Sequence, residues 1–301
     1  MRVLVTGADG FVGAHLCPLL RSAGFDVLAV SRSTHGDLTG VEWEKVLQGA
    51  DGLVHLANIA HRVADPGQLE AVNVLGTVRL ARAAHRAGVR RFVYLSSAKV
   101  YGESSGPVPF SESSQPSPED AYGRSKLSAE LALRAEINEA GLVVLRPPLV
   151  YGPGVRANFL ALLRAVYRGL PLPLASIRNQ RSLVSVGNLV DAVLACLRAP
   201  QAAGRTFNVA DGPAVSTPDL VRAIAVAFGK PPRLVAVSPR LLDFAGRLSG
   251  RRASINRLMS SLVLDDSAIR HALGWKPPQS FPEALGETAQ WYVRAQARVS
   301  G

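Results

Sequence analysis

The sequence lacks the features of disulfide-rich, membrane-spanning and metal-dependent proteins. Its two cysteines, Cys17 and Cys196, lie far apart, which excludes a disulfide framework and predicts a reducing, cytoplasmic location. No apolar run approaches the roughly 18 residues of a transmembrane helix, and the apolar segment Val3 to Val5 runs straight into a glycine turn, unlike a signal peptide. The six histidines are scattered without the spacing of metal ligands, so we expect no metal site.

Acidic residues are also scarce relative to basic ones, and the formal net charge is +11. The arginines are spread along the whole chain, whereas a nucleic-acid surface would concentrate them, so no nucleic-acid partner is expected. A basic protein suits small anionic ligands such as dinucleotides and nucleotide sugars. With 301 residues, of which 48% are hydrophobic, the chain can form a large core in one or two domains.

Short apolar runs alternate with helical patterns through the first half of the chain. The runs predict strands over 2–6, 26–30, 53–56, 91–97 and 142–145, and the patterns predict helices over 11–23, 68–86 and 121–140. This alternation predicts an α/β fold, a Rossmann-type doubly wound parallel sheet. Longer helices and proline breaks follow Gly154 and indicate a smaller, mixed α/β substrate-binding domain. We therefore expect a dinucleotide-binding domain over 1–153, to which 182–209 returns, and a substrate-binding domain over 154–181 and 210–301.

Three glycines, Gly7, Gly10 and Gly13, follow the first strand and open the first helix. This spacing lets the backbone turn tightly and approach a pyrophosphate, which then faces the free amides at the helix amino terminus. Another glycine-rich strand-to-helix turn could mimic the motif, but the required strand before it and helix after it are both predicted.

The second strand ends in Ser31-Arg32-Ser33 instead of an acidic residue. An acid near this position takes the ribose hydroxyls of NAD, while an arginine accommodates the 2′-phosphate of NADP. Arg32 therefore favours NADP(H), with NAD(H) as the alternative, unless Arg32 is simply a solvated residue at a strand end. Asp37 and Leu38 either flank the adenine or form an ordinary loop.

Tyr122 and Lys126 are four residues apart on a predicted helix, so their side chains share one face. A nearby ammonium favours the phenolate and is expected to bring the tyrosine pKa toward neutrality, as proton exchange in carbonyl and alcohol redox chemistry requires. Ser97 stands at the carboxyl end of the preceding strand, where it can bond the same substrate oxygen. A chance pairing of tyrosine and lysine and a serine that only caps a turn are the alternatives.

Together these motifs resemble the extended short-chain dehydrogenase/reductase family, which comprises nucleotide-sugar epimerases, dehydratases and reductases. The matching stretches are Thr6 to Gly13, Leu53 to Ala57, Asn73 with Gly76 and Thr77, Leu95 to Gly102, Tyr122 with Lys126, and Arg146 to Gly152. They stand in family order over nearly the whole chain.

The resemblance implies that Ser97, Tyr122 and Lys126 are catalytic and that Lys126 also holds the nicotinamide ribose. The dinucleotide contacts expected in addition are Gly7, Gly10, Phe11, Val12, Gly13, Ser31, Arg32, Asp37, Leu38, Leu56, Ala57, Asn58, Asn73 and Pro147. A UDP-linked sugar is expected as substrate, bound by Ser97, Lys99, Asn158, Arg181 and Arg257. Family members are often dimers through two long helices, here 68–86 and 119–140.

Two positions depart from the family pattern: Leu149 replaces a substrate-contacting asparagine, and Lys99 replaces a small residue. Lys99-Val100, Pro147 to Gly154 and Asn179 to Val184 are most similar to a bacterial subgroup in surface-polysaccharide synthesis. That subgroup reduces the 4-keto group of a UDP-linked 2-acetamido-2,6-dideoxy sugar, which gives our leading hypothesis. The alternatives are a UDP-hexose 4-epimerase with bound NAD and, in another class, a non-catalytic NADP-sensing protein.

The stretch from Pro239 to Val263 is basic and amphipathic. A helix of this kind either rests on a membrane surface or packs its apolar face against its own domain, and we expect the packing.

Overall fold

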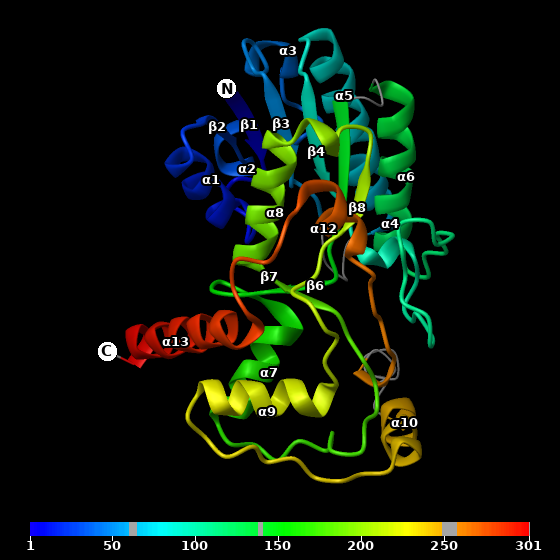
Figure 1. Cartoon of the computed structure of the whole chain (residues 1–301), viewed down its shortest axis with the longest axis vertical. Coiled ribbons are helices and arrows are strands. Elements are labelled where there is room, and N and C mark those ends of the chain that lie inside the picture. The colour runs from blue at the N-terminus through cyan, green and yellow to red at the C-terminus, as the bar shows by residue number, and fades with distance from the viewer. Residues whose placement is uncertain (60–64, 138–140, 249–257, 301) are drawn as a thin grey trace.

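A six-stranded parallel sheet forms the centre of the upper part of the molecule in the computed structural model, which describes residues 1–59, 65–137, 141–248 and 258–300 (Figure 1). Its order is β2-β1-β3-β4-β5-β8, and every pairing is parallel. The strands are β1 (Arg2–Thr6), β2 (Asp26–Val30), β3 (Gly52–His55), β4 (Arg91–Leu95), β5 (Leu142–Arg146) and β8 (Thr206–Asn208). The predicted doubly wound α/β architecture is confirmed.

Helices cover both faces of this sheet because its strands are apolar on both sides. Side chains alternate between the faces, so Val3 and Val5 pack into one buried cluster while Leu4 packs into the other. The first cluster includes residues of α1 (Gly13–Ser22) and α8 (Val186–Arg198). The second includes residues of α5 (Gly76–Arg86) and α6 (Ala121–Glu136). The carboxyl ends of the strands therefore remain as the edge at which a ligand can bind.

The helix predicted over 68–86 is divided into three pieces. It starts as α4 (Pro66–Leu69), continues as a π-helical segment η1 (Glu70–Leu75) and ends as α5. Such π segments are rare and are frequent at functional sites. The remaining short elements near the sheet are α2 (Arg32–His35), α3 (Trp43–Val46), η2 (Ala98–Val100) and η4 (Pro200–Ala202).

A third hydrophobic cluster, the lower cluster, lies below the sheet, around a two-stranded parallel pair. Its elements are β6 (Leu149–Tyr151), β7 (Leu183–Ser185), α7 (Ala157–Tyr167), α9 (Thr217–Ala227), α10 (Pro239–Leu248) and α13 (Phe281–Ser300). The chain crosses between the two parts repeatedly: α12 (Ser267–Leu273) brings Ile269 into the sheet cluster that also contains residues of α1 and α8, and Trp275, which follows α12, joins the same cluster. The sequence-based division, which assigned all of 210–301 to the lower part, places this segment differently.

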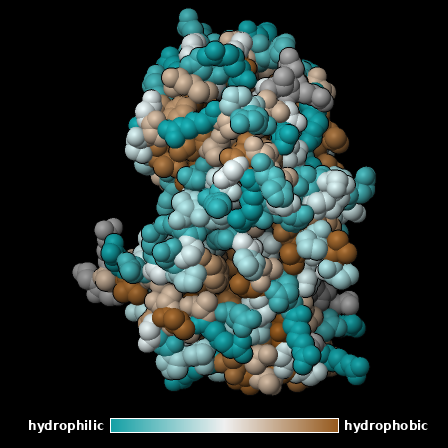
Figure 2. Space-filling model, viewed as in Figure 1, coloured by the Kyte–Doolittle hydropathy of each residue, from teal (hydrophilic) through white to brown (hydrophobic). Residues whose placement is uncertain are grey.

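The surface seen in Figure 2 is mainly hydrophilic, with smaller hydrophobic areas in its upper and lower parts. In α10, Leu242 packs against the lower cluster, but Leu241 and Phe244 are 58% and 57% exposed. The packing expected for the stretch 239–263 is therefore seen for only part of α10. Residues 249–257 of this stretch lie outside the described residues. Within the described ranges, no helix is long and apolar enough to cross a membrane.

A buried ion pair connects α6 to the sheet near the carboxyl ends of the strands. The Arg146 guanidinium on β5 donates to both carboxylate oxygens of Glu130, at 3.0 Å and 2.5 Å, and the Glu130 side chain is wholly buried. Arg146 also donates to the Tyr101 hydroxyl, which in turn donates to Asn208 on β8. Burial acts to lower the pKa of Arg146, but the hydrogen bonds and charge of Glu130 outweigh it, so the guanidinium stays charged.

The variant Arg146→Met is expected to lower the free energy of unfolding by about 3–5 kcal/mol, because it leaves the Glu130 carboxylate as a buried, poorly compensated charge. Urea denaturation followed by circular dichroism measures the loss. The matched control is Arg82→Met, which breaks the exposed pair between Arg82 and Glu136 and should cost far less. Equal losses in the two variants would contradict the role given to the buried pair.

Candidate active site

The glycine loop after β1 has the close backbone packing that a dinucleotide site requires. Gly7 has a φ of +69°, and a Cβ at this position would lie 2.8 Å from the backbone nitrogen of Ala57, so only glycine fits. The Gly10 amide donates to the Gly7 carbonyl at 2.9 Å, which closes the turn. Helix α1 begins at Gly13, so its amino terminus faces the strand ends. This cradle fits a pyrophosphate.

The end of β2 is joined to the glycine loop by a hydrogen-bonded group that the sequence did not reveal. Asp9 accepts a hydrogen bond from the Ser33 hydroxyl at 2.5 Å, and the Ser31 and Ser33 hydroxyls are 2.8 Å apart. Hydrogen bonds from the two serines lower the pKa of Asp9. Arg32 instead forms an ion pair with Asp37 at 2.9 Å. The carboxylate at this strand end thus comes from the loop.

Two asparagines lie behind the glycine loop, one of them with an unused hydrogen-bonding atom. The Asn58 amide donates to the Leu56 carbonyl at 2.8 Å, while its buried Oδ1 has no hydrogen-bond partner among the described residues. Asn73, in the π segment, accepts from the Ile59 amide at 2.8 Å and donates to the Ser125 hydroxyl at 3.0 Å. An unpaired buried acceptor beside the loop fits a ligand that brings a donor.

The predicted Tyr122 and Lys126 lie on one face of α6, next to Ser97 at the end of β4. The Lys126 ammonium is 6.0 Å from the centre of the Tyr122 ring. It donates to the Leu95 carbonyl at 2.7 Å and to the Tyr94 hydroxyl at 3.3 Å, and the lysine is 1% exposed. Ser97 is hydrogen-bonded to the Tyr122 side chain. The structure therefore brings the three residues together at the carboxyl edge of the sheet.

The pKa directions differ from the expectation drawn from spacing. Burial lowers the pKa of Lys126 to about 7, although the charge of Glu130 acts in the opposite direction. Burial raises the pKa of Tyr122, as does the charge of Asp120, and the Ser97 hydrogen bond only partly offsets them. The expected lowering of the Tyr122 pKa is thus not seen, because burial of the phenol and the Asp120 charge together outweigh the hydrogen bond from Ser97.

The amino terminus of α6 approaches the Ser97 turn closely at Gly123. A Cβ on Gly123 would lie 2.5 Å from the Lys99 carbonyl oxygen, so the glycine allows the contact. Asp120 caps the helix by accepting from the Gly123 amide at 2.7 Å. The sequence carried both signals, a glycine after the tyrosine and an acid two residues before it, and they explain how Tyr122 reaches Ser97.

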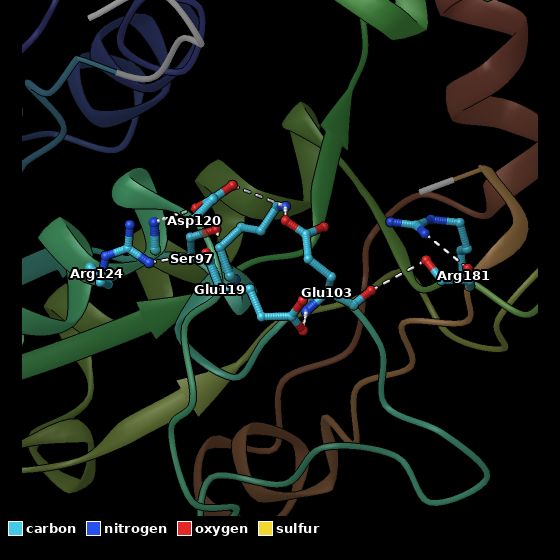
Figure 3. Close-up of polar contacts among 9 residues, drawn as sticks. Ser97, Glu103, Glu119, Asp120, Arg124 and Arg181 are labelled. Carbon is cyan, nitrogen blue, oxygen red and sulfur yellow. Dashed lines mark hydrogen bonds and ion pairs between the residues drawn. The ribbon is translucent and has the colours of Figure 1, made fainter. Parts of the chain in front are cut away.

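Three chain segments meet near this edge. Segment 258–264 pairs its backbone with the loop after η2, where Phe110 donates to Val263 at 2.8 Å, and with Ser182, which donates to Leu262 at 2.9 Å. Arg181 donates to the Ser260 carbonyl at 3.0 Å, and the Ser260 hydroxyl donates to the Glu103 carbonyl (Figure 3). Arg181 is therefore linked through this segment to the loop beside Ser97.

The other predicted contacts lie in varied surroundings. Asn158 is exposed in the first turn of α7, and Leu149 is 44% exposed. Lys99 contacts two carboxylates, those of Glu103 and Asp120. Arg257 lies outside the described residues. Four predicted dinucleotide contacts remain: Phe11 and Val12 in the glycine loop pack against the sheet cluster, Leu38 is buried, and Pro147 accepts from the Ala98 amide.

Comparison with known proteins matches residues 3–210 to the NAD dependent epimerase/dehydratase family. A "UDP-glucose 4-epimerase" of Vibrio cholerae is 39% identical, with 98% of this chain and 97% of that protein covered. A "GDP-6-deoxy-D-mannose reductase" of Pseudomonas aeruginosa is 28% identical, with 94% of both covered. Solved structures of MoeE5 with NAD and either UDP-glucuronic acid or UDP-glucose are 30% identical, have TM-scores of 0.82 and 0.80, and cover 98% of this chain and 100% of theirs.

The family match spans more than half of the chain, and it includes the glycine loop, the serine turn and the Tyr122 helix described above. The predicted family is confirmed: the chain belongs to the NAD dependent epimerase/dehydratase family.

Proposed function

We propose that the protein is a UDP-sugar 4-epimerase that works with retained NAD. The observation that carries this proposal is the match, over nearly the full length of both chains, to the Vibrio cholerae UDP-glucose 4-epimerase. The MoeE5 complexes, which hold NAD together with UDP-sugars, support the same assignment.

The roles of the three edge residues follow from their chemistry. Tyr122 takes the proton of the sugar 4-hydroxyl as the C4 hydride leaves, and returns it to the same oxygen when, after the 4-keto sugar has rotated, hydride comes back to the opposite face of C4. Ser97, hydrogen-bonded to Tyr122, bonds the same oxygen and orients it. Lys126, held by the Leu95 carbonyl, stabilises the phenolate and binds the nicotinamide ribose. A bound NAD supplies the acceptor and donor of hydride.

A 4-ketoreductase, our leading hypothesis from sequence, uses the same three residues once and in one direction only. The Pseudomonas aeruginosa reductase supports it at 28% identity, below the 39% of the epimerase. In that case Tyr122 would supply a proton as the 4-keto group is reduced. The non-catalytic alternative has less support, because both Tyr122 and Lys126 are present and adjacent.

We propose NAD as the cofactor because the strand end that meets the adenosine ribose carries a carboxylate. Asp9, fixed by Ser33, supplies the acid that usually stands at the end of β2 and bonds the ribose hydroxyls of NAD. The Arg32 charge is compensated by Asp37. Asp9, Arg32 and Asp37 together carry one net negative charge, which would repel a 2′-phosphate. This argues against the NADP(H) preference expected from Arg32.

Exposed apolar residues on the outer side of α6 and η1 support the homodimer expected from the family resemblance. Leu131 is 59% exposed and Leu75 is 53% exposed, and the exposed ion pair of Arg82 with Glu136 joins α5 to α6 beside them. We propose that two copies associate through these helices.

Purified protein is expected to interconvert UDP-glucose and UDP-galactose, or their 2-acetamido counterparts, without any added dinucleotide, because each cycle returns the hydride it removes. Nuclear magnetic resonance of the sugar products measures the conversion. Net consumption of added NADPH with a UDP-4-keto-6-deoxy sugar, without interconversion of the epimers, would support the reductase and refute the epimerase.

The variant Tyr122→Phe is expected to lower kcat by roughly 10² to 10⁴, the worth of a positioned acid–base group. The matched control is Tyr167→Phe, because the Tyr167 ring packs among Phe228 and Tyr292, away from the edge, and should retain activity. Near-normal turnover by Tyr122→Phe would show that Tyr122 is not the acid–base group.

Once its retained dinucleotide has been removed, the wild-type protein is expected to bind NADH more tightly than NADPH, and Asp9→Asn should reduce this preference by about fivefold, the order of one charge interaction in water. Fluorescence titration with the two reduced dinucleotides measures both affinities. Asp26→Asn, at the opposite end of β2, removes the same charge and is the control. If the wild-type protein bound NADPH more tightly than NADH, and Arg32→Ser weakened NADPH binding, the NADP(H) preference inferred from Arg32 would be correct.

A further inference from the structure

Helix α10 turns an apolar pair of side chains outward, at the opposite end of the molecule from the six-stranded sheet (Figure 1). Leu242 packs into the lower cluster, whereas Leu241 and Phe244 are more than half exposed. Side chains three residues apart share one face of a helix, so Leu241 and Phe244 are neighbours. Adjacent exposed apolar side chains with polar residues around them are typical of an interaction site.

Basic side chains border this apolar pair. Arg240 and Arg247 stand four residues before and three residues after Phe244, so both lie along one edge of the same face, and both are exposed. The Arg247 guanidinium pairs with Asp243 at 2.8 Å, whereas Arg240 is in no ion pair with a described residue. We call Arg240, Leu241, Phe244 and Arg247 the α10 outer face.

The part of the sequence around this face carries almost no negative charge. Between Asp219 and Asp265, eight basic residues stand against Asp243 as the single acid. One of the eight, Arg233, lies in the segment that leads into α10, is exposed and has no ion-pair partner among the described residues. Most of the net charge of +11 therefore arises in the stretch that includes the α10 outer face.

An apolar pair bordered by arginines matches the boundary between the headgroups and the acyl chains of a bilayer. At this boundary, leucine and phenylalanine enter the hydrocarbon while arginine meets lipid phosphates. A nucleic acid would compensate the arginines but leave the apolar side chains in water. A second copy of the same face would bury the apolar side chains but bring like charges together. Of these three partners, an anionic lipid surface alone complements both kinds of side chain.

We propose that the α10 outer face binds the surface of a membrane that contains anionic phospholipid. Helix α10 lies along the surface, and Leu241 and Phe244 insert between the headgroups. Because only two large apolar side chains and a few arginines take part, the attachment is reversible and requires the anionic lipid. The proposal does not depend on the reaction at the edge of the sheet.

The test is co-sedimentation of the full chain with vesicles of phosphatidylcholine alone, and with vesicles of equal parts phosphatidylcholine and phosphatidylglycerol. Binding is expected only to the second kind, and added salt should release the protein because it screens the charges. Leu241→Ser and Phe244→Ser should each weaken binding about tenfold. Arg240→Gln should weaken it about fivefold. The matched controls, Val108→Ser and Lys45→Gln, remove an exposed apolar residue and an exposed charge outside α10 and should bind as the wild type does.

A second readout shows whether the apolar pair enters the lipid. Phe244→Trp places an indole in the α10 outer face, and the three tryptophans of the wild type lie outside α10. Vesicles that contain phosphatidylglycerol and lipids with brominated acyl chains should therefore quench the fluorescence of Phe244→Trp more than that of the wild type. Circular dichroism of each variant checks that it is folded.

Absence of binding to the anionic vesicles would overturn the proposal, as would equal binding to both kinds of vesicle. Wild-type binding by Leu241→Ser and Phe244→Ser would overturn it as well. If the wild type bound no vesicles but formed an oligomer that dissociates in Phe244→Ser, as measured by sedimentation velocity, the face would instead join two copies of the chain. Failure of the proposed epimerase reaction would leave all of these measurements unaffected.

Discussion

The candidate site depends on a buried amine that can still carry a charge near neutral pH. Lys126 is almost fully buried, and desolvation alone would discharge it at neutral pH. The Lys126 ammonium donates a hydrogen bond to the Leu95 carbonyl, and Glu130, one helical turn further along α6, supplies the opposing charge. Glu130 is itself held by Arg146 on β5. The charges of Lys126, Glu130 and Arg146 thus connect the edge of the sheet, helix α6 and strand β5.

Much of the fold was predictable because its signals are local. Each strand of the parallel sheet is a short apolar run, and the glycine loop follows β1 at a fixed spacing, so both are visible without knowledge of distant contacts. The π segment around Asn73 was not predictable from local sequence. The Asn73 side chain bonds the Ile59 backbone and the Ser125 hydroxyl, and both partners lie far away in sequence. Likewise, nothing in the local sequence indicated that Ile269 of α12 packs into the sheet cluster that contains α1 and α8.

The site was predictable in its membership more than in its electrostatics. Four-residue spacing correctly placed Tyr122 and Lys126 on one helical face, and the end of β4 supplied Ser97. The direction of the tyrosine pKa could not be obtained this way, because it depends on how deeply the phenol is buried. The position of Asp9 could not be predicted for a related reason: it belongs to the glycine loop, and only the folded chain brings its carboxylate to Ser33 at the end of β2.

Segment 258–264 has a consequence for biosynthesis. Its backbone bonds hold the loop that contains Phe110 on one side and Gln180 with Ser182 on the other. These partners leave the ribosome long before it does. All six strands of the sheet and the glycine loop therefore leave the ribosome first, whereas the side that segment 258–264 joins, and the sheet cluster that Ile269 and Trp275 help to fill, are completed only when translation has nearly finished. A messenger RNA that stopped before codon 258 would encode all six strands and the glycine loop, but its product would lack the segment that joins the Phe110 loop to Gln180 and Ser182.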